Sequence, residues 1–594
     1  MKRITYIVMV LAFVFSSCED MLDTTNYTQM TTETFPEKYE HAQQMLTAIY
    51  QNLSQVSANP QMSFFYLSTL ASDDNFGGGG KNDKLMQAED LLCNYQNDML
   101  NQFWTDRYTG IFRANNLINN IDNCKDYPSQ DARNSILGGA LTLRAFYYYE
   151  LVSQFGRIPL VTIAEPTDPE QASAAAVFGQ ILLDLKTASD IMPAQKATVD
   201  GEVDKYIAEA LLARTWLYYT GMYCNGEEIS ALTNTNYQPL SSVKLADGST
   251  LTKDDVVKYI DDCVEHSGYS LVGDFRNLWA YTNKCTKDDY YYTKGVSGLK
   301  WVEDDNAMNP ESMFKIKFNK LASWQTTIGY CNQYNLHFGV RGGQDLAKTF
   351  PFGQGWGAGP VAPNLVNDWK SAEPNDIRLE ASIQNVNKLP AYNRGGWADF
   401  VQETDYYMKK NAPISAVNTD KATYPANDYL PCFEILMYGS SNWSNDSKPV
   451  NFQLNNIHDL VLLRFADVLL MQSELKESIT GINRVRARVG LTPIGAYSLK
   501  ALQNERRWEL AFEGTRWNDI RRWHIAADAL EAQAGQPTYL AGSPDKNTAH
   551  NGGYKARYNA TAGFFKIPEK QISLSKVLTQ NPGWGTAEGE YTGW

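Results

Sequence analysis

The sequence predicts a mostly α-helical protein that forms one large domain with a loop-rich face. Apolar residues spaced three and four apart run through most of the first 225 residues and return after about residue 456. Between about 226 and 455 this periodicity is lost, and Gly, Asn, Pro, Tyr and Trp become frequent. No charged linker, low-complexity tract or Pro-rich hinge divides the 594 residues, so a single body is the simplest interpretation.

The start of the chain predicts export. Lys2 and Arg3 precede an apolar run over residues 4–15, and small residues lead to Cys18. This pattern is typical of a signal peptide over residues 1–17, because the run is too short for a permanent membrane span. The position of Cys18 resembles a bacterial lipobox, which predicts that Cys18 is lipidated as the first residue of the mature chain. The alternative is an ordinary signal peptide with an incidental cysteine.

Composition excludes several classes of function. A net charge of −14 and a pI near 5.1 argue against nucleic acid as the ligand, because nothing would neutralise its phosphates. The eight cysteines and six histidines are scattered, without C-x-x-C or H-E-x-x-H spacing, so we expect no metal centre and no cofactor. A structural calcium ion stays open, since ASDDNFGGGG and VEDDN offer oxygen ligands without the EF-hand spacing.

Helical periodicity predicts a scaffold over about 40–225 and 456–530, followed by a C-terminal segment, 531–594. The expected helices are His41–Val56, Asn97–Ile121, Ile136–Phe155, Val203–Tyr223, Leu460–Leu475 and residues 499–530. Two of them share Ala-Leu, Arg and Tyr at equal offsets, beginning at Ala140 and at Ala210. Small residues beside large aromatic ones are typical of tetratricopeptide hairpins, although chance similarity between Ala- and Tyr-rich helices is the alternative.

ERRWELAFEGTRWNDIRRW, residues 505–523, mixes nine charged residues with large apolar ones. Apolar side chains lie on both sides of a helical wheel, so we expect a largely buried helix. Its charges can pair at i, i+3, as Arg506 and Glu509 would. Glu509 and Glu513 also have the chemistry of a glycosidase pair, but they share one stripe of one helix and are flanked by arginines, which favours structural ion pairs.

This segment resembles the C-terminal signature of the SusD/RagB family of Bacteroidetes nutrient-binding lipoproteins. Further segments match in the expected order: CEDMLD at 18–23, LRAFYYYELVSQFGRIPLV at 143–161, LLRFADVLLMQSE at 462–474 and FKIPEKQISLSKVLTQNPGW at 565–584. The resemblance implies a SusD-like domain over 18–594, with a tetratricopeptide-like scaffold and a variable, loop-rich face that carries the ligand site.

The same resemblance implies function and location. Such a protein is a non-catalytic glycan-binding lipoprotein on the extracellular side of the outer membrane, anchored by lipid at Cys18. Its implied partner is a SusC-like TonB-dependent transporter, to which it delivers oligosaccharide or polysaccharide. The signature at 505–523 then belongs to the scaffold and not to the ligand site.

Sugars present flat C–H faces and edge hydroxyls, so a surface site needs exposed aromatic planes with polar groups at the rim. The candidate stacking residues are Trp279, Tyr281, Trp301, Trp324 and Phe76, and the candidate polar residues are Asp73, Asp74 and Arg341. Four glycines at 77–80 permit close backbone approaches beside them. Trp356 ranks lower, because GQGWG looks like a structural turn. For each aromatic residue, packing of its loop onto the scaffold is the alternative.

Two other functions stay open at this point. Peptide cargo on the same scaffold would rely more on backbone pairing at a sheet edge than on exposed aromatic residues. A glycoside hydrolase would need two opposed carboxylates, and Asp73 with Asp304 or Asp305 is the pair to examine. The sequence does not specify which polysaccharide is bound.

Overall fold

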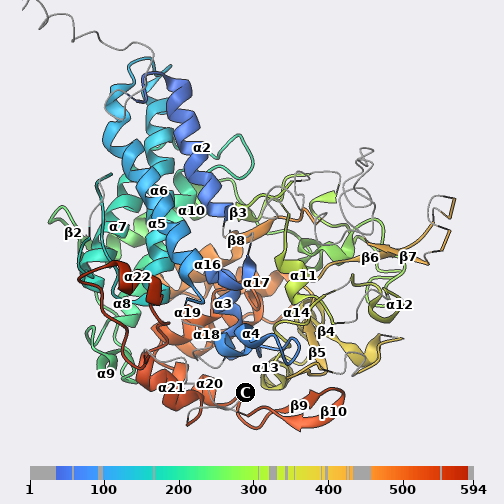
Figure 1. The fold of residues 1–594 in the computed structure, drawn as a ribbon. Helices are drawn as coiled ribbons and strands as arrows, with labels where there is room; N and C mark the ends of the chain where they lie inside the picture. The colour runs from blue at the N-terminus through green and yellow to red at the C-terminus, as the bar shows by residue number, and fades with distance from the viewer. Residues whose placement is uncertain are drawn as a thin grey trace, which may run out of the picture.

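Helices dominate the part of the chain that the computed structural model describes. That part comprises residues 35–55, 59–90, 98–164, 168–304, 307–319, 331–341, 346–353, 355–389, 391–394, 399–419, 421–422, 425–426, 428–431, 456–548 and 552–585. Long helices stand side by side on one flank of the molecule, and the loop-rich segments gather on the other (Figure 1). The predicted signal peptide, Cys18 and Trp324 lie outside the described residues.

The scaffold begins with helices that pack in sequence order. They are α2 (Tyr39–Gln55), α3 (Phe64–Leu70), α4 (Lys84–Asp90), α5 (Asn101–Asn120), α6 (Gln130–Phe155), α7 (Ala174–Ile191), α8 (Lys205–Met222), α9 (Ile229–Leu232) and α10 (Lys253–His266). Helix α6 packs against α5 and α7, and α7 packs in turn against α8. Four of the predicted helices match α2, α5, α6 and α8, whereas α7 and α10 were not predicted.

Local sequence signals account for these helix ends. Ser129, Ser173 and Asp204 each accept a hydrogen bond from a backbone N–H in the first turn of α6, α7 and α8. Thr252 and Asp255 form a capping box at the start of α10. Helix α6 ends at Phe155, and its C-cap Gly156 has a φ of 71°, a conformation that glycine adopts readily.

The shared positions of α6 and α8 have similar roles. Arg144 on α6 pairs with Asp184 on α7 at 2.6 Å, and Arg214 on α8 pairs with Asp467 at 2.6 Å. Both arginines are mostly buried, so each needs a carboxylate from a neighbouring helix. The repeated arginine therefore joins adjacent helices.

The second helical part differs from the prediction at two places. It contains α16 (Phe465–Lys476), α17 (Thr480–Arg488), α18 (Leu499–Glu509), α19 (Arg516–Arg522), α20 (Ala526–Glu531), α21 (Tyr554–Thr561) and α22 (Glu569–Leu574). The predicted helix from residue 460 begins instead as strand β8 (Leu460–Arg464), because its β-branched and leucine residues pair with β3 (Ser312–Ile316). The predicted helix over 499–530 breaks after Glu509, where Phe512 and Gly514 both have positive φ.

The loop-rich part contains short elements only. Its helices are α11 (Tyr334–Phe338), α12 (Leu346–Thr349), α13 (Pro363–Ala372) and α14 (Ile377–Ser382). The remaining strands are β1 (Ser242–Lys244), β2 (Thr250–Thr252), β4 (Ile383–Asn385), β5 (Tyr406–Met408), β6 (Ser415–Val417), β7 (Tyr429–Pro431), β9 (Pro537–Leu540) and β10 (Ser543–Lys546). They pair as two-stranded antiparallel ribbons, β1–β2, β4–β5, β6–β7 and β9–β10.

Separate apolar cores support these parts. The larger one joins the scaffold helices. It extends to α13 through the stacked rings of Trp369 and Trp508, whose centroids lie 5.1 Å apart. A smaller core lies under the loops and includes Tyr281, Trp301 and Phe400. Among the described residues, no helix is both long and apolar enough to cross a membrane.

Candidate functional site

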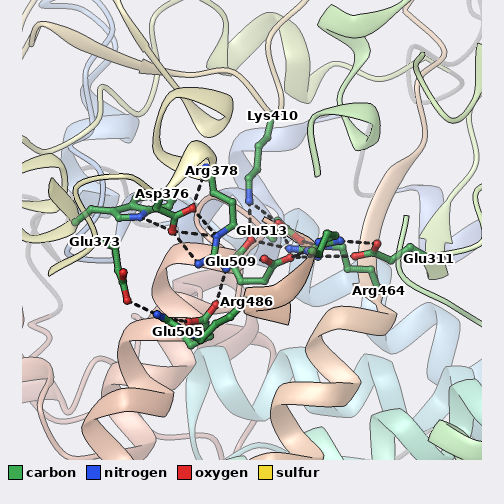
Figure 2. Close-up of polar contacts among 12 residues, drawn as sticks. Glu311, Glu373, Asp376, Arg378, Lys410, Arg464, Arg486, Glu505, Glu509 and Glu513 are labelled. Carbon is green, nitrogen blue, oxygen red and sulfur yellow. Dashed lines mark hydrogen bonds and ion pairs between the residues drawn. The ribbon is translucent and has the colours of Figure 1, made fainter. Parts of the chain in front are cut away.

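The signature at 505–523 lies at a buried ion network between scaffold and loops. Glu509 is fully buried and pairs with Arg378 at 2.9 Å, with Arg464 at 2.5 Å and with Arg488. Figure 2 shows these contacts, together with those of Lys410 and Glu513. The predicted burial is therefore correct, but the expected local pairing of Arg506 with Glu509 is wrong, because Arg506 pairs with Asp467 and Asp519.

Asp73 and Asp74 belong to the scaffold as well. The Asp73 carboxylate accepts two hydrogen bonds from Arg516, at 2.7 and 2.8 Å, and Asp74 pairs with Arg507 at 2.7 Å. Burial alone would raise the pKa of Asp73, but Arg516 and Arg507 hold it below its usual range. Both carboxylates are buried and form ion pairs with these arginines, which corrects their predicted role as ligand contacts. A carboxylate held in this way does not suit a glycosidase either, and its proposed partner Asp304 is also buried.

Most of the predicted aromatic platforms face the interior. Phe76, Tyr281 and Trp301 are buried, and the Tyr281 hydroxyl donates to the Ala381 carbonyl at 2.9 Å. Tyr281 and Trp301 belong to the small core, and large aromatic side chains gain most from burial. These three predictions of ligand contact are therefore corrected. Trp279 is half-buried, and its ring centroid lies 4.7 Å from the Lys410 amine.

Trp279 and Trp301 line one cavity. It also contacts Glu303, Asn309, Ser312, Asn335, Lys410, His458, Asp459 and Arg464. Its volume of about 60 Å³ is room for a few water molecules and not for a sugar ring. Burial, with Asp459 nearby, raises the pKa of Glu303 to about 7. The cavity thus holds an acid that titrates near neutrality, but it does not hold a glycan.

Arg341 is the predicted residue that stands at a polar surface. Its guanidinium lies 3.5 Å from the Asp83 carboxylate and 3.4 Å from that of Asp399, and it donates to the Trp356 carbonyl at 2.7 Å. The Asp83 and Asp399 side chains are 39% and 35% exposed, so each keeps acceptor capacity toward solvent. We call Asp83, Arg341, Trp356 and Asp399 the Arg341 cluster.

The glycine run holds this cluster together. Gly80 pairs with Phe400 and Gly78 with Ala358 in isolated antiparallel bridges, and the Lys81 N–H donates to the Asp399 carbonyl at 2.8 Å. A side chain at Gly80 would stand 2.8 Å from the Asp399 carboxylate and 2.9 Å from the Arg341 guanidinium. The predicted close approach at 77–80 is therefore present, and only glycine fits.

The Arg341 cluster has the chemistry to bind a polyhydroxylated ligand. Carboxylates accept hydrogen bonds, a guanidinium donates them, and a sugar hydroxyl does both. Half-buried Trp356 adjoins the cluster through its carbonyl, which accepts from Arg341, and its ring lies 4.6 Å from the His337 ring. Burial lowers the pKa of His337 to about 3, so this imidazole stays neutral and adds no charge. Among the described residues, no group of three His, Cys, Asp or Glu side chains could hold a metal ion.

Sequence reasoning missed Asp83 and Asp399 and ranked Trp356 too low. No local pattern distinguishes Asp83 or Asp399 from other surface acids. The available signal was the pair of glycines on either side of Trp356, because Gly355 and Gly357 let the chain pass directly over Gly339 and Arg341. The pattern predicts a structural turn, and the structure shows that it also brings the Trp356 carbonyl within hydrogen-bonding distance of Arg341.

Comparisons with known sequences agree with this architecture. The family model described as "SusD family" matches residues 310–584, and the model described as "Starch-binding associating with outer membrane" matches residues 20–217. A SusD-like protein of Formosa agariphila is 22% identical over 550 residues, covering 89% of this chain and 92% of that protein. A SusD-like protein of Bacteroides ovatus is 21% identical over 436 residues, covering 71% of this chain and 65% of that protein.

Solved structures share the fold. A laminarin-binding SusD-like protein matches with a TM-score of 0.64 and 23% identity, covering 92% of this chain and 100% of that one. Surface glycan-binding protein A from Bacteroides thetaiotaomicron, solved with laminarihexaose, matches with a TM-score of 0.62 and 20% identity, covering 92% and 99%. The two family models together span most of the sequence, from the first scaffold helices to the C-terminal segment. This chain therefore belongs to the SusD/RagB family.

Proposed function

We propose that the protein is a non-catalytic glycan-binding protein and that the Arg341 cluster is part of its binding site. The observation that carries this proposal is the arrangement of Arg341 between two half-exposed carboxylates beside a half-buried tryptophan. The glycan-binding relatives with the same fold support it. Trp279 and Trp324, which the sequence singled out, are proposed as further contacts.

The test is affinity electrophoresis of the soluble chain that begins after Cys18, against a panel of polysaccharides that includes laminarin. Asp399→Asn and Trp356→Ala should each weaken retardation about tenfold, because each removes a charged hydrogen bond or an apolar contact. Phe112→Ala is the matched control, since Phe112 is an exposed aromatic residue on α5, away from the Arg341 cluster. Trp279→Ala and Trp324→Ala test the other two contacts.

Each outcome of this assay has a distinct meaning. Retardation that is lost in the cluster variants and kept in Phe112→Ala supports the proposed site. Retardation that survives in all cluster variants would move the site elsewhere on the protein. If no polysaccharide retards the wild type, peptide cargo becomes the better proposal, and a peptide library is the next ligand set.

We further propose that the protein is anchored by lipid at Cys18 on the outer face of the outer membrane and delivers glycan to a SusC-like TonB-dependent transporter. The lipobox-like sequence before Cys18 supports the anchor, and family membership supports the partner. Metabolic labelling with a fatty acid should mark the wild type and not Cys18→Ala. Purification of tagged, membrane-extracted protein should recover the transporter; its absence would argue against delivery by this route.

A further inference from the structure

A fully buried carboxylate lies directly behind the glycine run. Asp90, the last residue of α4, accepts hydrogen bonds from the Gly77 N–H at 3.2 Å, from the Gln402 amide at 2.9 Å and from the Tyr554 hydroxyl at 3.3 Å. Only 1% of its surface is exposed. Asp90 therefore connects the glycine run with two distant segments of the chain.

Gln402 holds the next residue of the run. Its carbonyl oxygen accepts from the Gly78 N–H at 3.0 Å, while its amide nitrogen donates to Asp90 and, at 3.0 Å, to the Asn547 side chain. Gln402 has a φ of 51°, an unfavourable conformation for a residue with a side chain, so surrounding contacts must hold it there. Consecutive backbone N–H groups of the glycine run are thus bound by two interacting side chains.

This arrangement fixes the distance between the glycine run and Arg341. Gly78 has a φ of 70°, and the run gains no rigidity from side chains of its own. From the other side, the Gln87 amide donates to the carbonyls of Gly78 and Gly80, at 3.3 and 3.1 Å. Backbone bonds hold the run as well, from the Gly79 N–H to the Gly357 carbonyl at 3.1 Å and from the Lys81 N–H to the Asp399 carbonyl at 2.8 Å. The side-chain contacts add to this pairing and limit how far Gly80 can move from the Arg341 cluster.

We propose that Asp90 and Gln402 are positioning residues for glycan binding: their hydrogen bonds to Gly77 and Gly78 set the geometry of the Arg341 cluster. This inference rests on the proposed function of that cluster. Neither residue touches the ligand in this scheme. Both act through the backbone of the glycine run.

Ionisation of Asp90 offers a specific signature for this role. Its three neighbours are all hydrogen-bond donors, which suits a carboxylate better than a carboxylic acid. Burial raises the pKa of Asp90 to about 7, against the lowering effect of hydrogen bonds from Gln402, Gly77 and Tyr554. Two other titratable groups lie near Asp90: Tyr554 on α21, which donates to it, and Glu89, its neighbour on α4. Burial raises the pKa of Glu89 well above its usual value.

The positioning role can be measured without any ligand. The readout is amide hydrogen exchange, measured on the peptide that spans residues 76–86. Its rate is divided by the rate of the same peptide when unstructured, and it includes the Gly77 and Gly78 N–H groups. Gln402→Ala should speed this exchange about fivefold, the value of one hydrogen bond. Gln571→Ala on α22 is the matched control, since the Gln571 amide donates to Asn101 and not to the glycine run.

Glycan affinity gives the second readout. The wild type should bind its polysaccharide about fivefold more tightly at about pH 8 than at about pH 6, on either side of the Asp90 pKa. Asp90→Asn should weaken this pH dependence. Gln402→Glu keeps the length of the side chain but puts a second carboxylate where the Gln402 amide donates to Asp90, so it should recover none of the affinity that Gln402→Ala loses.

The two proposals fail separately. Unchanged exchange in both Gln402→Ala and Asp90→Asn would overturn the positioning role. If the wild type binds no polysaccharide, the proposed function fails, while the exchange experiment still decides whether Asp90 and Gln402 hold the glycine run. Circular dichroism spectra that match the wild type are required of every variant.

Discussion

Replacing Glu509 with glutamine should destabilise the protein strongly. Glu509 pairs with three arginines, Arg378, Arg464 and Arg488, and its side chain is fully buried. Glutamine keeps the shape but removes one buried carboxylate from the network. Arg378 keeps Asp376 and Glu505, but Arg464 and Arg488 then share Glu311, so the buried positive charge is compensated only in part. Removing one partner from a buried ion pair costs about 3–5 kcal/mol, because a charge then stays buried without compensation. Urea denaturation followed by tryptophan fluorescence would measure the loss as a lower midpoint of unfolding.

A matched control separates burial from charge. Glu477→Gln removes the same charge from a pair with Lys253, 3.5 Å apart, in which the two side chains are 69% and 42% exposed. Exposed pairs contribute about 0–1 kcal/mol, so this variant should unfold close to the wild type. Equal midpoints for Glu509→Gln and Glu477→Gln would refute the reasoning.

The stability that Glu509 contributes should also depend on pH. Burial alone would raise the pKa of Glu509, but Arg488, Arg464 and Arg378 outweigh it and hold the pKa well below its usual value. A carboxyl of this kind contributes stability above its unfolded pKa of about 4.3, and the contribution is lost as the pH falls through the folded pKa. The difference between wild type and Glu509→Gln should therefore be complete at about pH 7 and shrink below about pH 4.

Three further predictions concern other parts of the molecule. Gly78→Ala should lower the thermal midpoint in differential scanning calorimetry, because Gly78 has a φ of 70° and a Cβ would lie 2.4 Å from the Gly357 carbonyl; an unchanged midpoint would mean that the loop is free to shift. Cys263 should react with a thiol reagent only after unfolding, since burial raises its pKa well above the usual value, and Cys263→Ser should leave the native thiol count unchanged. Arg144→Met should cost about 3–5 kcal/mol in urea denaturation by leaving Asp184 buried and unpaired, whereas Arg133→Met, from a pair with exposed Asp122, should not.

Local chemistry made some helices predictable, such as α6, whereas α7 and α10 were missed although a serine cap and a capping box mark their starts. The apolar spacing of α6, the Ser129 cap and Gly156 at its end all act within a few residues of each other. The break after Glu509 was not predictable in this way, because local propensity allows a continuous helix. Long-range ion pairs to Arg378 and Arg464 decide the course of the chain there. Strand β8 was missed for the same reason, since its partner β3 lies far away in the sequence.

The candidate site was predictable only in part. The glycine run stood out because four consecutive glycines permit close backbone approaches, and Arg341 was the basic residue among the candidate polar contacts. The buried state of Asp73 and Asp74 could not be inferred, since their partners Arg507 and Arg516 lie more than four hundred residues further along the chain. Asp399 was missed because its role depends on where Lys81 and Arg341 place it. Tertiary contacts, and not composition, separate a scaffold carboxylate from one that faces solvent.

The ion pairs of Asp73 and Asp74 with Arg516 and Arg507 also impose an order of assembly. A chain exported by its signal peptide crosses the membrane from its N-terminus, and helices α5 to α8 can pack on one another as they emerge. The Asp73 and Asp74 carboxylates stay hydrated until Arg507 and Arg516 have crossed as well. Completion of the scaffold beside the glycine run is therefore a late event in folding, and a prematurely terminated chain would carry formed helices without a formed site.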